Sequence, residues 1–308
     1  MSESEFVLHH YALSPFSEKI RVMLGYTGLE WCSVTTDEMP PRPLLAPLAG
    51  GYRKIPVAQI GADVFCDTRT ITREIARLSG KPELALDNVS EEVQAFVREA
   101  DLELFLACIL SSTSWRLNIK LFKAFSLFNL LRFFRDRIRI GRTSNVPRMG
   151  LMASRARVRE HLDGLEARLS EHDFLFADRP NIGDFSAYHG LWFLRDVAES
   201  PVFGKYPRVA AWMDRMRDFG HGDAVEMSPN AALKLARARA PRELPEAGIK
   251  APLLGQTVSV APDDYGQVPV TGTLVSATAD SWILARTNPA AGTVHIHFPR
   301  QGFALTAA

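Results

Sequence analysis

Cysteine is scarce in this chain and never closely paired. The 308 residues contain three cysteines, Cys32, Cys66 and Cys108, at wide and irregular spacing. An odd number without a C-x-x-C pair excludes a cysteine-paired metal or redox site and fits a reducing compartment. We therefore expect the three thiols to be small apolar parts of the core.

Long apolar runs and an excess of charge are also missing. Every apolar stretch is broken by Lys or Arg within about a dozen residues, short of the roughly 20 that span a bilayer. The formal net charge is +1, which gives no whole-chain reason to expect nucleic acid as a partner. The acidic residues 1–6 lack the basic and apolar segments of a secretory signal. We expect a cytoplasmic protein without a transmembrane helix.

The pattern of strands and helices changes twice along the chain. Up to about residue 80 the order is β-α-β-loop-β-β-α, with the proline-rich residues 39–43 in the loop. From residue 91 to about 239, apolar residues recur at spacings of three and four, which predicts helices throughout. After a linker rich in proline and charge, alternating segments predict a small antiparallel β domain or barrel. The sequence thus predicts an α+β protein with domains at 1–82, 90–240 and 248–308.

One segment between the first strand and the first helix suggests a specific chemistry. It reads Ser14-Pro-Phe-Ser-Glu-Lys-Ile-Arg21 and places Ser14 at the helix N-terminus, where unpaired N–H groups and the helix dipole favour an anion. A free thiol has a pKa of about 8.5, so a hydroxyl donor here would raise the thiolate fraction of a bound thiol. Taken alone, the motif fits a helix cap by Ser14 or Ser17 equally well.

Two further segments suit the remainder of a peptide ligand. Pro56 opens a strand, which is permitted at a sheet edge or at the first position of a strand. An exposed edge with a cis Ile55–Pro56 bond would let the Ile55 backbone pair with a cysteinyl unit. Asp67 and Thr68, where a strand ends and a helix begins, can hold an ammonium and a carboxylate group. Alone, each of these segments is usually structural.

In order and spacing, the three segments resemble the N-terminal domain of the cytosolic glutathione transferase superfamily, especially its tau and omega-like classes and bacterial relatives with Ser-Pro-Phe. The resemblance covers roughly residues 5–235. It implies a thioredoxin-like domain followed by an all-helical domain in which Asn181 and Asp184 form a capping box. It also implies glutathione as cosubstrate, no metal, a homodimer and a role in detoxification.

The resemblance assigns roles to single residues. Ser14 would donate to the glutathione sulfur, and Ser17 or Tyr11 would take that role if Ser14 does not. Ile55 would pair with the cysteinyl backbone, and a lysine near Lys54 often assists with the glycyl carboxylate. The residues expected at the glutathione site are Lys54, Ile55, Pro56, Asp67 and Thr68, and those at the second-substrate pocket are Tyr11, Phe16 and Trp115.

Departures from the family pattern restrict these expectations. The family more often has Glu-Ser where this chain has Asp67-Thr68, and the aspartate side chain is one methylene shorter than that of glutamate. Serine at position 14, where omega-like members carry a redox cysteine, argues against thiol–disulfide exchange and favours conjugation of the thiol to a small electrophile. The β region 248–308 lies outside the pattern. The alternative function is a non-catalytic glutathione-binding or scaffold protein whose β region mediates interactions.

Two other features suggest less specific functions. Residues 116–159 hold two lysines and ten arginines against one acid, interleaved with phenylalanines, as in a surface for anionic membranes or nucleic acid. Acidic residues in the preceding helix offset this charge, so we favour a solvated basic face; an acidic substrate is a further option. His295 and His297 share one strand face, but no nearby Cys or acid in the sequence completes a metal set, which favours a structural role.

Overall fold

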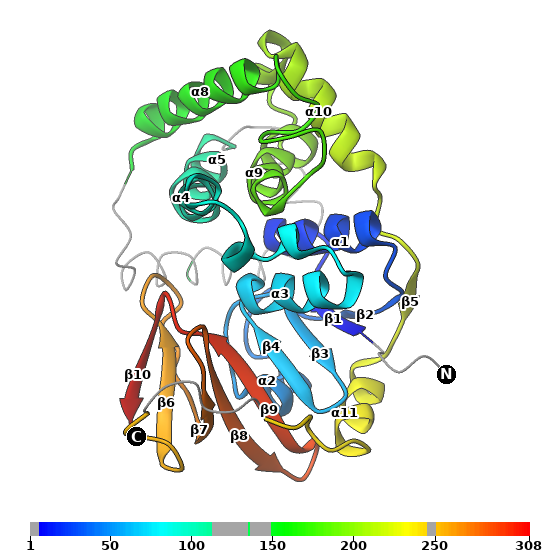
Figure 1. Ribbon diagram of the computed structural model, residues 1–308, viewed down its shortest axis with the longest axis vertical. Coiled ribbons are helices and arrows are strands. Elements are labelled where there is room, and N and C mark those ends of the chain that lie inside the picture. Colours follow the sequence, from blue (N-terminus) through cyan, green and yellow to red (C-terminus); the bar gives the residue numbers. More distant parts are fainter. Residues whose placement is uncertain (1–5, 113–134, 136–148, 245–250) are drawn as a thin grey trace.

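The N-terminal part of the chain has the predicted order of elements. The structure is a computed structural model that describes residues 6–112, 135, 149–244 and 251–308 (Figure 1). The elements are β1 (Phe6–His10), α1 (Pro15–Thr27), β2 (Trp31–Thr35), α2 (Ala46–Ala49), β3 (Val57–Ile60), β4 (Asp63–Cys66) and α3 (Thr68–Ser79). β1 pairs in parallel with β2 and antiparallel with β3, which forms a hairpin with β4. The short helix α2 was not predicted.

The next helices form a separate layer, and α1 and α3 lie between this layer and most of the sheet, as Figure 1 shows. They are α4 (Glu91–Glu99), α5 (Phe105–Ser111), α8 (Leu151–Arg168), α9 (Ile182–Trp192) and α10 (Pro207–Asp218). A π-helical segment, Ala100–Leu104, joins α4 to α5, and a second, Phe193–Val197, extends α9. Three short 3₁₀ segments are Pro82–Leu84, Leu86–Asn88 and Pro201–Lys205. None of the described helices is long and apolar enough to cross a bilayer.

The predicted capping box begins α9 and is confirmed. The Asn181 side chain accepts from the Gly183 N–H at 2.8 Å, and Asp184 accepts from the Asn181 N–H at 3.0 Å. Asp184 is fully buried and also accepts from the Leu175 N–H and the Trp212 indole N–H. Burial raises the pKa of Asp184 to about 6 although these hydrogen bonds act in the opposite direction. The box therefore fixes the central helix to two neighbouring segments.

The chain returns to the N-terminal sheet before the C-terminal region begins. β5 (Ala224–Glu226) pairs in parallel with β2, and α11 (Pro229–Arg237) follows it. The prediction of helices up to about residue 239 is therefore wrong for residues 224–226. A strand of three residues is too short to show alternation, and it forms because β2 offers an open edge.

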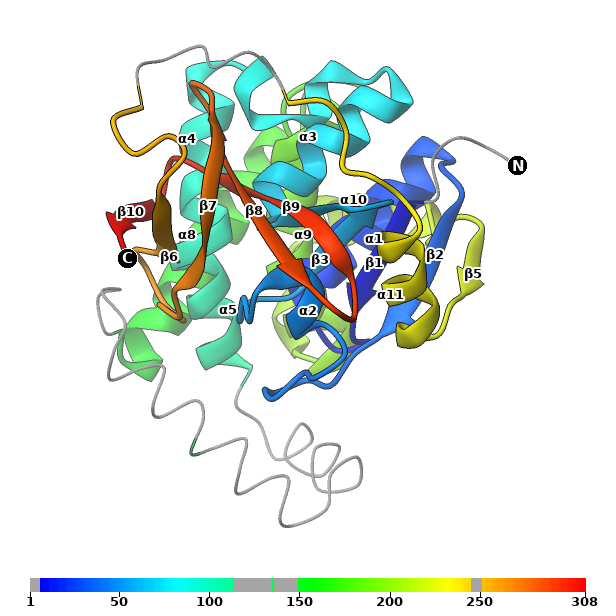
Figure 2. The ribbon, with the colours of Figure 1, turned by 90° about the horizontal axis from the view of Figure 1, so that it is seen from below.

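The C-terminal strands extend the same sheet. They are β6 (Thr257–Pro262), β7 (Val270–Ala277), β8 (Ser281–Asn288), β9 (Gly292–Pro299) and β10 (Phe303–Ala307). Neighbouring strands are antiparallel, and β9 pairs in parallel with β4 through Val64 and Ile296. The ten strands of the described residues run in the order β10-β6-β7-β8-β9-β4-β3-β1-β2-β5. Figure 2 shows β6 to β9 beside the N-terminal strands, so the β region covers the edge of β4.

A hydrophobic core is shared between the β region and the N-terminal domain. Tyr52 lies 5.8 Å from the Phe298 ring and 6.3 Å from the Phe303 ring, measured between ring centroids. Val57, Val64 and Cys66 belong to the same buried cluster. Burying one such large side chain contributes about 1.5 to 3 kcal/mol. The β region is thus packed against the N-terminal domain as part of one structure.

Candidate functional site

Ser14 caps the N-terminus of α1. Its backbone is extended, and its Oγ accepts a hydrogen bond from the Ser17 N–H at 3.2 Å. Its own N–H donates to the Tyr11 carbonyl at 3.2 Å, which closes the turn of residues 11–14. Within the described part of the chain, no hydrogen bond is made by the Ser14 hydroxyl as donor. The proton of Ser14 is therefore free to be donated to a ligand at the positive end of the helix.

A partly open cleft of about 110 Å³ is lined in part by Ser14. Tyr11, Phe16 and Phe105 form an aromatic part of its wall. The remaining lining residues are Ser14, Pro15, Glu38, Pro40, Arg42, Arg53, Lys54, Ile55, Tyr265 and Gly266. Pockets that enclose a drug-sized ligand usually hold about 300 Å³ or more. The cleft is therefore too small for a whole drug-sized ligand and suits one small group of a ligand.

The structure brings together five of the residues expected from the sequence. Tyr11, Ser14, Phe16, Lys54 and Ile55 line the same cleft. The Ile55–Pro56 bond is cis, and no hydrogen bond of the Ile55 backbone is found among the described residues.

The other expected residues lie elsewhere. Ser17 Oγ is fully buried and has no partner among the described residues, so it faces the core. Asp67 and Thr68 do not line the cleft. Trp115 falls outside the described residues.

The expectation of an exposed sheet edge at Pro56 is wrong. β3 is a central strand, paired on one side with β1 and on the other with β4. Pro56 precedes Val57, the first residue of β3, and therefore removes no hydrogen bond from the ladder. A sheet edge and the start of a central strand both tolerate proline, so the sequence around Pro56 does not distinguish them. The pairing of β3 with β1 and β4 does.

Asp67 has an unusual backbone conformation directly before α3. Its φ is +80°, a value that residues other than glycine seldom adopt and that strains the backbone by about 1 to 3 kcal/mol. Its side chain accepts from the Arg69 N–H at 3.0 Å, and the Thr70 hydroxyl donates to the Asp67 carbonyl at 2.9 Å. Strain held in place by hydrogen bonds is typical of ligand sites.

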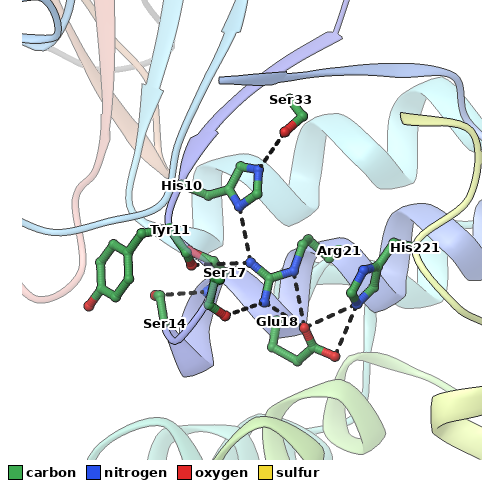
Figure 3. Close-up of polar contacts among 9 residues, drawn as sticks. His10, Tyr11, Ser14, Ser17, Glu18, Arg21, Ser33 and His221 are labelled. Atoms are coloured by element: carbon green, nitrogen blue, oxygen red, sulfur yellow. Dashed lines mark hydrogen bonds and ion pairs between the residues drawn. The ribbon is translucent and has the colours of Figure 1, made fainter. Parts of the chain in front are cut away.

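The buried Arg21 side chain supports the turn that carries Ser14 (Figure 3). Its guanidinium donates to the carbonyls of Tyr11 at 3.2 Å and Ala12 at 2.9 Å. The same group donates to Glu18, which also contacts His221 at 3.1 Å. Burial alone would raise the pKa of Glu18, but His221 and Arg21 lower it below its usual value. Arg21 was not singled out from the sequence, where it is one basic residue on a helix.

Arg21 also fixes the protonation of His10. An arginine only donates, so His10 Nδ1, 3.0 Å from Arg21, must be the acceptor. His10 Nε2 then carries the proton and donates to Ser33 Oγ at 3.0 Å, and Ser33 donates to Glu226 at 3.2 Å. Burial and the charge of Arg21 lower the pKa of His10 to about 4. The imidazole is therefore neutral at pH 7 and completes a chain of hydrogen bonds from the Ser14 turn to β5.

A second buried cluster joins α1 to the helical domain behind the cleft. Lys19, only 1% exposed, contacts both carboxylate oxygens of Asp101, at 2.8 and 3.0 Å. His189 Nε2 lies 3.1 Å from Asp101, and the centroid of its ring lies 4.4 Å from that of Phe16, with the two rings tilted by 35°. Burial alone would raise the pKa of Asp101, but the Lys19 charge holds it well below its usual range. Lys19, Asp101 and His189 therefore link α1 to α9 and to the segment between α4 and α5, next to Phe16.

The histidines of the β region have a structural contact. His297 Nε2 lies 2.7 Å from Asp63 Oδ1, and both side chains are buried. Asp63, which is distant in the sequence, therefore pairs with His297, and this contact agrees with the structural role expected for the histidine. In the described residues, no group of three or more His, Cys, Asp or Glu is placed to hold a metal ion.

Comparisons with known proteins agree with this architecture. The sequence profile of the glutathione S-transferase N-terminal domain matches residues 8–83, and that of the C-terminal domain matches residues 125–215. A solved GST-like protein from Pseudomonas syringae is 33% identical, aligns over 99% of this chain and 100% of its own, and has a TM-score of 0.79. The fold and these matches define a protein of the glutathione transferase type. The chain belongs to the cytosolic glutathione S-transferase superfamily, and it carries an additional C-terminal β domain.

More distant structures resemble only part of the chain. FzlA from C. crescentus is 22% identical over 69% of this chain and 88% of its own, with a TM-score of 0.49. A glutathione S-transferase of class Gtt2 from Vibrio parahaemolyticus is 16% identical over 68% of this chain and 92% of its own, with a TM-score of 0.44. These likenesses are too weak to support a conclusion on function. No curated protein sequence gives a significant match.

Proposed function

We propose that this chain is a glutathione transferase in which Ser14 donates a hydrogen bond to the glutathione sulfur. The observation that carries the proposal is the Ser14 hydroxyl, which lines the cleft at the helix N-terminus with its proton not used by the described residues. A thiolate there would gain one hydrogen bond and the field of the helix dipole. Both effects lower the pKa of the bound thiol and raise the fraction of nucleophile.

The reaction follows from this arrangement. The thiol proton leaves to solvent, the sulfur lone pair forms a bond to an electrophilic carbon, and the leaving group departs with its electron pair. Tyr11, Phe16 and Phe105 supply an aromatic wall on which an apolar electrophile can pack. We therefore expect small, largely apolar electrophiles as second substrates, which fits a role in detoxification. From the family we also expect a homodimer.

The γ-glutamyl end of glutathione is assigned to Asp67 and Thr68. Thr68 begins α3, where free N–H groups can bind a carboxylate, and Asp67 can accept an ammonium group. Asp67→Ala should mainly weaken glutathione binding, with a smaller effect on kcat.

Two measurements test the proposal together. The chain should be retained on immobilised glutathione, and it should transfer glutathione to a generic aromatic electrophile. Retention without transfer would favour the alternative of a glutathione-binding or scaffold protein. The β region packed on the N-terminal domain is the observation that supports this alternative. Absence of both activities would refute the proposal.

A further inference from the structure

The loop between β6 and β7 reaches the cleft from the β domain. Tyr265 and Gly266 of this loop line the cleft that also contains Ser14. Gly266 has a φ of +65°, and a side chain at this position would approach Arg53 Cδ to 3.3 Å. The loop therefore lies against the N-terminal domain beside Arg53 and Lys54, and the shared core below it fixes the β domain in this place.

Asp264 of this loop holds Lys54, a cation of the cleft. Its two carboxylate oxygens lie 2.7 and 2.8 Å from Lys54 Nζ. The Lys54 and Asp264 side chains are 14% and 26% exposed. Lys54 Nζ also lies 4.1 Å from the centre of the Tyr265 ring, a cation–π distance. The Tyr265 N–H donates to Asp264 at 2.6 Å, which orients the carboxylate.

We propose that Asp264 competes with the terminal carboxylate of the thiol cosubstrate for Lys54. The site then discriminates little between a cosubstrate with a free carboxylate and one whose carboxylate is masked. An anionic ligand in the cleft has to share Lys54 with Asp264 or displace Asp264 from it. Because the ion pair is shielded from water, replacing Asp264 by a ligand carboxylate loses the free energy of the existing pair. The cosubstrate class is then γ-glutamyl thiols in general, including those with an amide or ester at the last residue. The inference rests on the proposed glutathione site.

The test compares glutathione with its glycyl monoethyl ester, which lacks only the free carboxylate. Calorimetric titration gives the Kd of each thiol, and the ratio of the two values measures the discrimination. In the unaltered chain the ratio should be close to one. Asp264→Asn keeps the side-chain shape but removes the charge, and it should raise the preference for glutathione about fivefold to tenfold.

Two variants serve as controls. Asp280→Asn removes the same charge from the turn between β7 and β8, away from the cleft, and should leave the ratio unchanged. Lys54→Met in the Asp264→Asn background should abolish the gained preference, because Lys54 is the group that Asp264 releases.

The outcomes separate this inference from the proposed function. Binding of both thiols with the same ratio in the unaltered chain and in Asp264→Asn would overturn the inference and leave the proposed function standing. Binding without turnover would contradict the proposed chemistry, and the binding ratio would still decide the inference. Binding gained only in Asp264→Asn would contradict both proposals for the unaltered chain, because neither thiol would then bind to it. No binding of either thiol by any of these proteins would overturn both.

Discussion

Replacing Ser14 tests how much one hydroxyl contributes to thiol activation. A hydrogen bond to a charged group contributes about 1.5 to 3 kcal/mol, and one pKa unit corresponds to about 1.4 kcal/mol. Ser14→Ala should therefore raise the pKa of bound glutathione by about one to two units, towards the value of about 8.5 for a free thiol. Turnover at pH 7 should fall about tenfold and recover as the pH rises above the new pKa. Affinity should change little.

The assay is the ultraviolet absorbance of the bound thiolate as a function of pH, together with the pH profile of kcat/KM. Ser14 also caps α1, so Ser14→Ala should lose about 1 kcal/mol of stability, whereas Ser14→Gly loses only a few tenths. The two variants should nevertheless raise the thiol pKa equally, and Ser14→Thr should restore it. A thiol pKa that stays unchanged in Ser14→Ala would refute the reasoning and transfer the role to Tyr11.

Three further predictions address the surroundings of the cleft. Arg21→Lys keeps the charge but cannot hold Tyr11, Ala12 and Glu18 together, so we expect a raised thiol pKa in the same absorbance assay; lost stability with an unchanged thiol pKa would restrict Arg21 to a structural role. His10 is buried with its pKa lowered to about 4, below the unfolded value of 6.5, so its contribution to stability is complete above pH 6.5 and is lost as the pH falls towards 4. A shift from 6.5 to about 4 corresponds to about 3 kcal/mol. Urea unfolding at several pH values should show a smaller loss of stability at low pH in His10→Gln than in the unaltered chain, and equal losses in both proteins would argue against the assigned protonation. Phe298→Ala should destabilise the chain by about 3 to 5 kcal/mol, measured by urea unfolding against the exposed Leu254→Ala as control, and a small loss would mean that the β domain is not part of one core.

Local sequence patterns were sufficient for the N-terminal elements other than the short helix α2, and for the position of Ser14 at the start of α1. The continuous buried run of β1, the helical spacing in α1 with Gly28 at its end, and the capping box of Asn181 and Asp184 are each set within a few residues of sequence. Each of these features is determined by neighbours in the chain, so the sequence shows it directly.

Contacts between distant residues could not be predicted in this way. Lys19 and Asp101 are 82 positions apart, and Lys54 and Asp264 are 210 apart, so no local pattern records either ion pair. The continuation of the sheet from β4 to β9 has the same cause, because an alternating strand pattern does not state its partner. The parts of the site that depend on the β domain therefore become visible only in the folded chain.

A crystal structure of the chain with bound glutathione tests the central claim most directly. The account predicts the glutathione sulfur within hydrogen-bonding distance of Ser14 Oγ, in the cleft between the start of α1 and Ile55. Glutathione bound elsewhere, or a sulfur turned away from a Ser14 that bonds only to the Ser17 N–H, would contradict it.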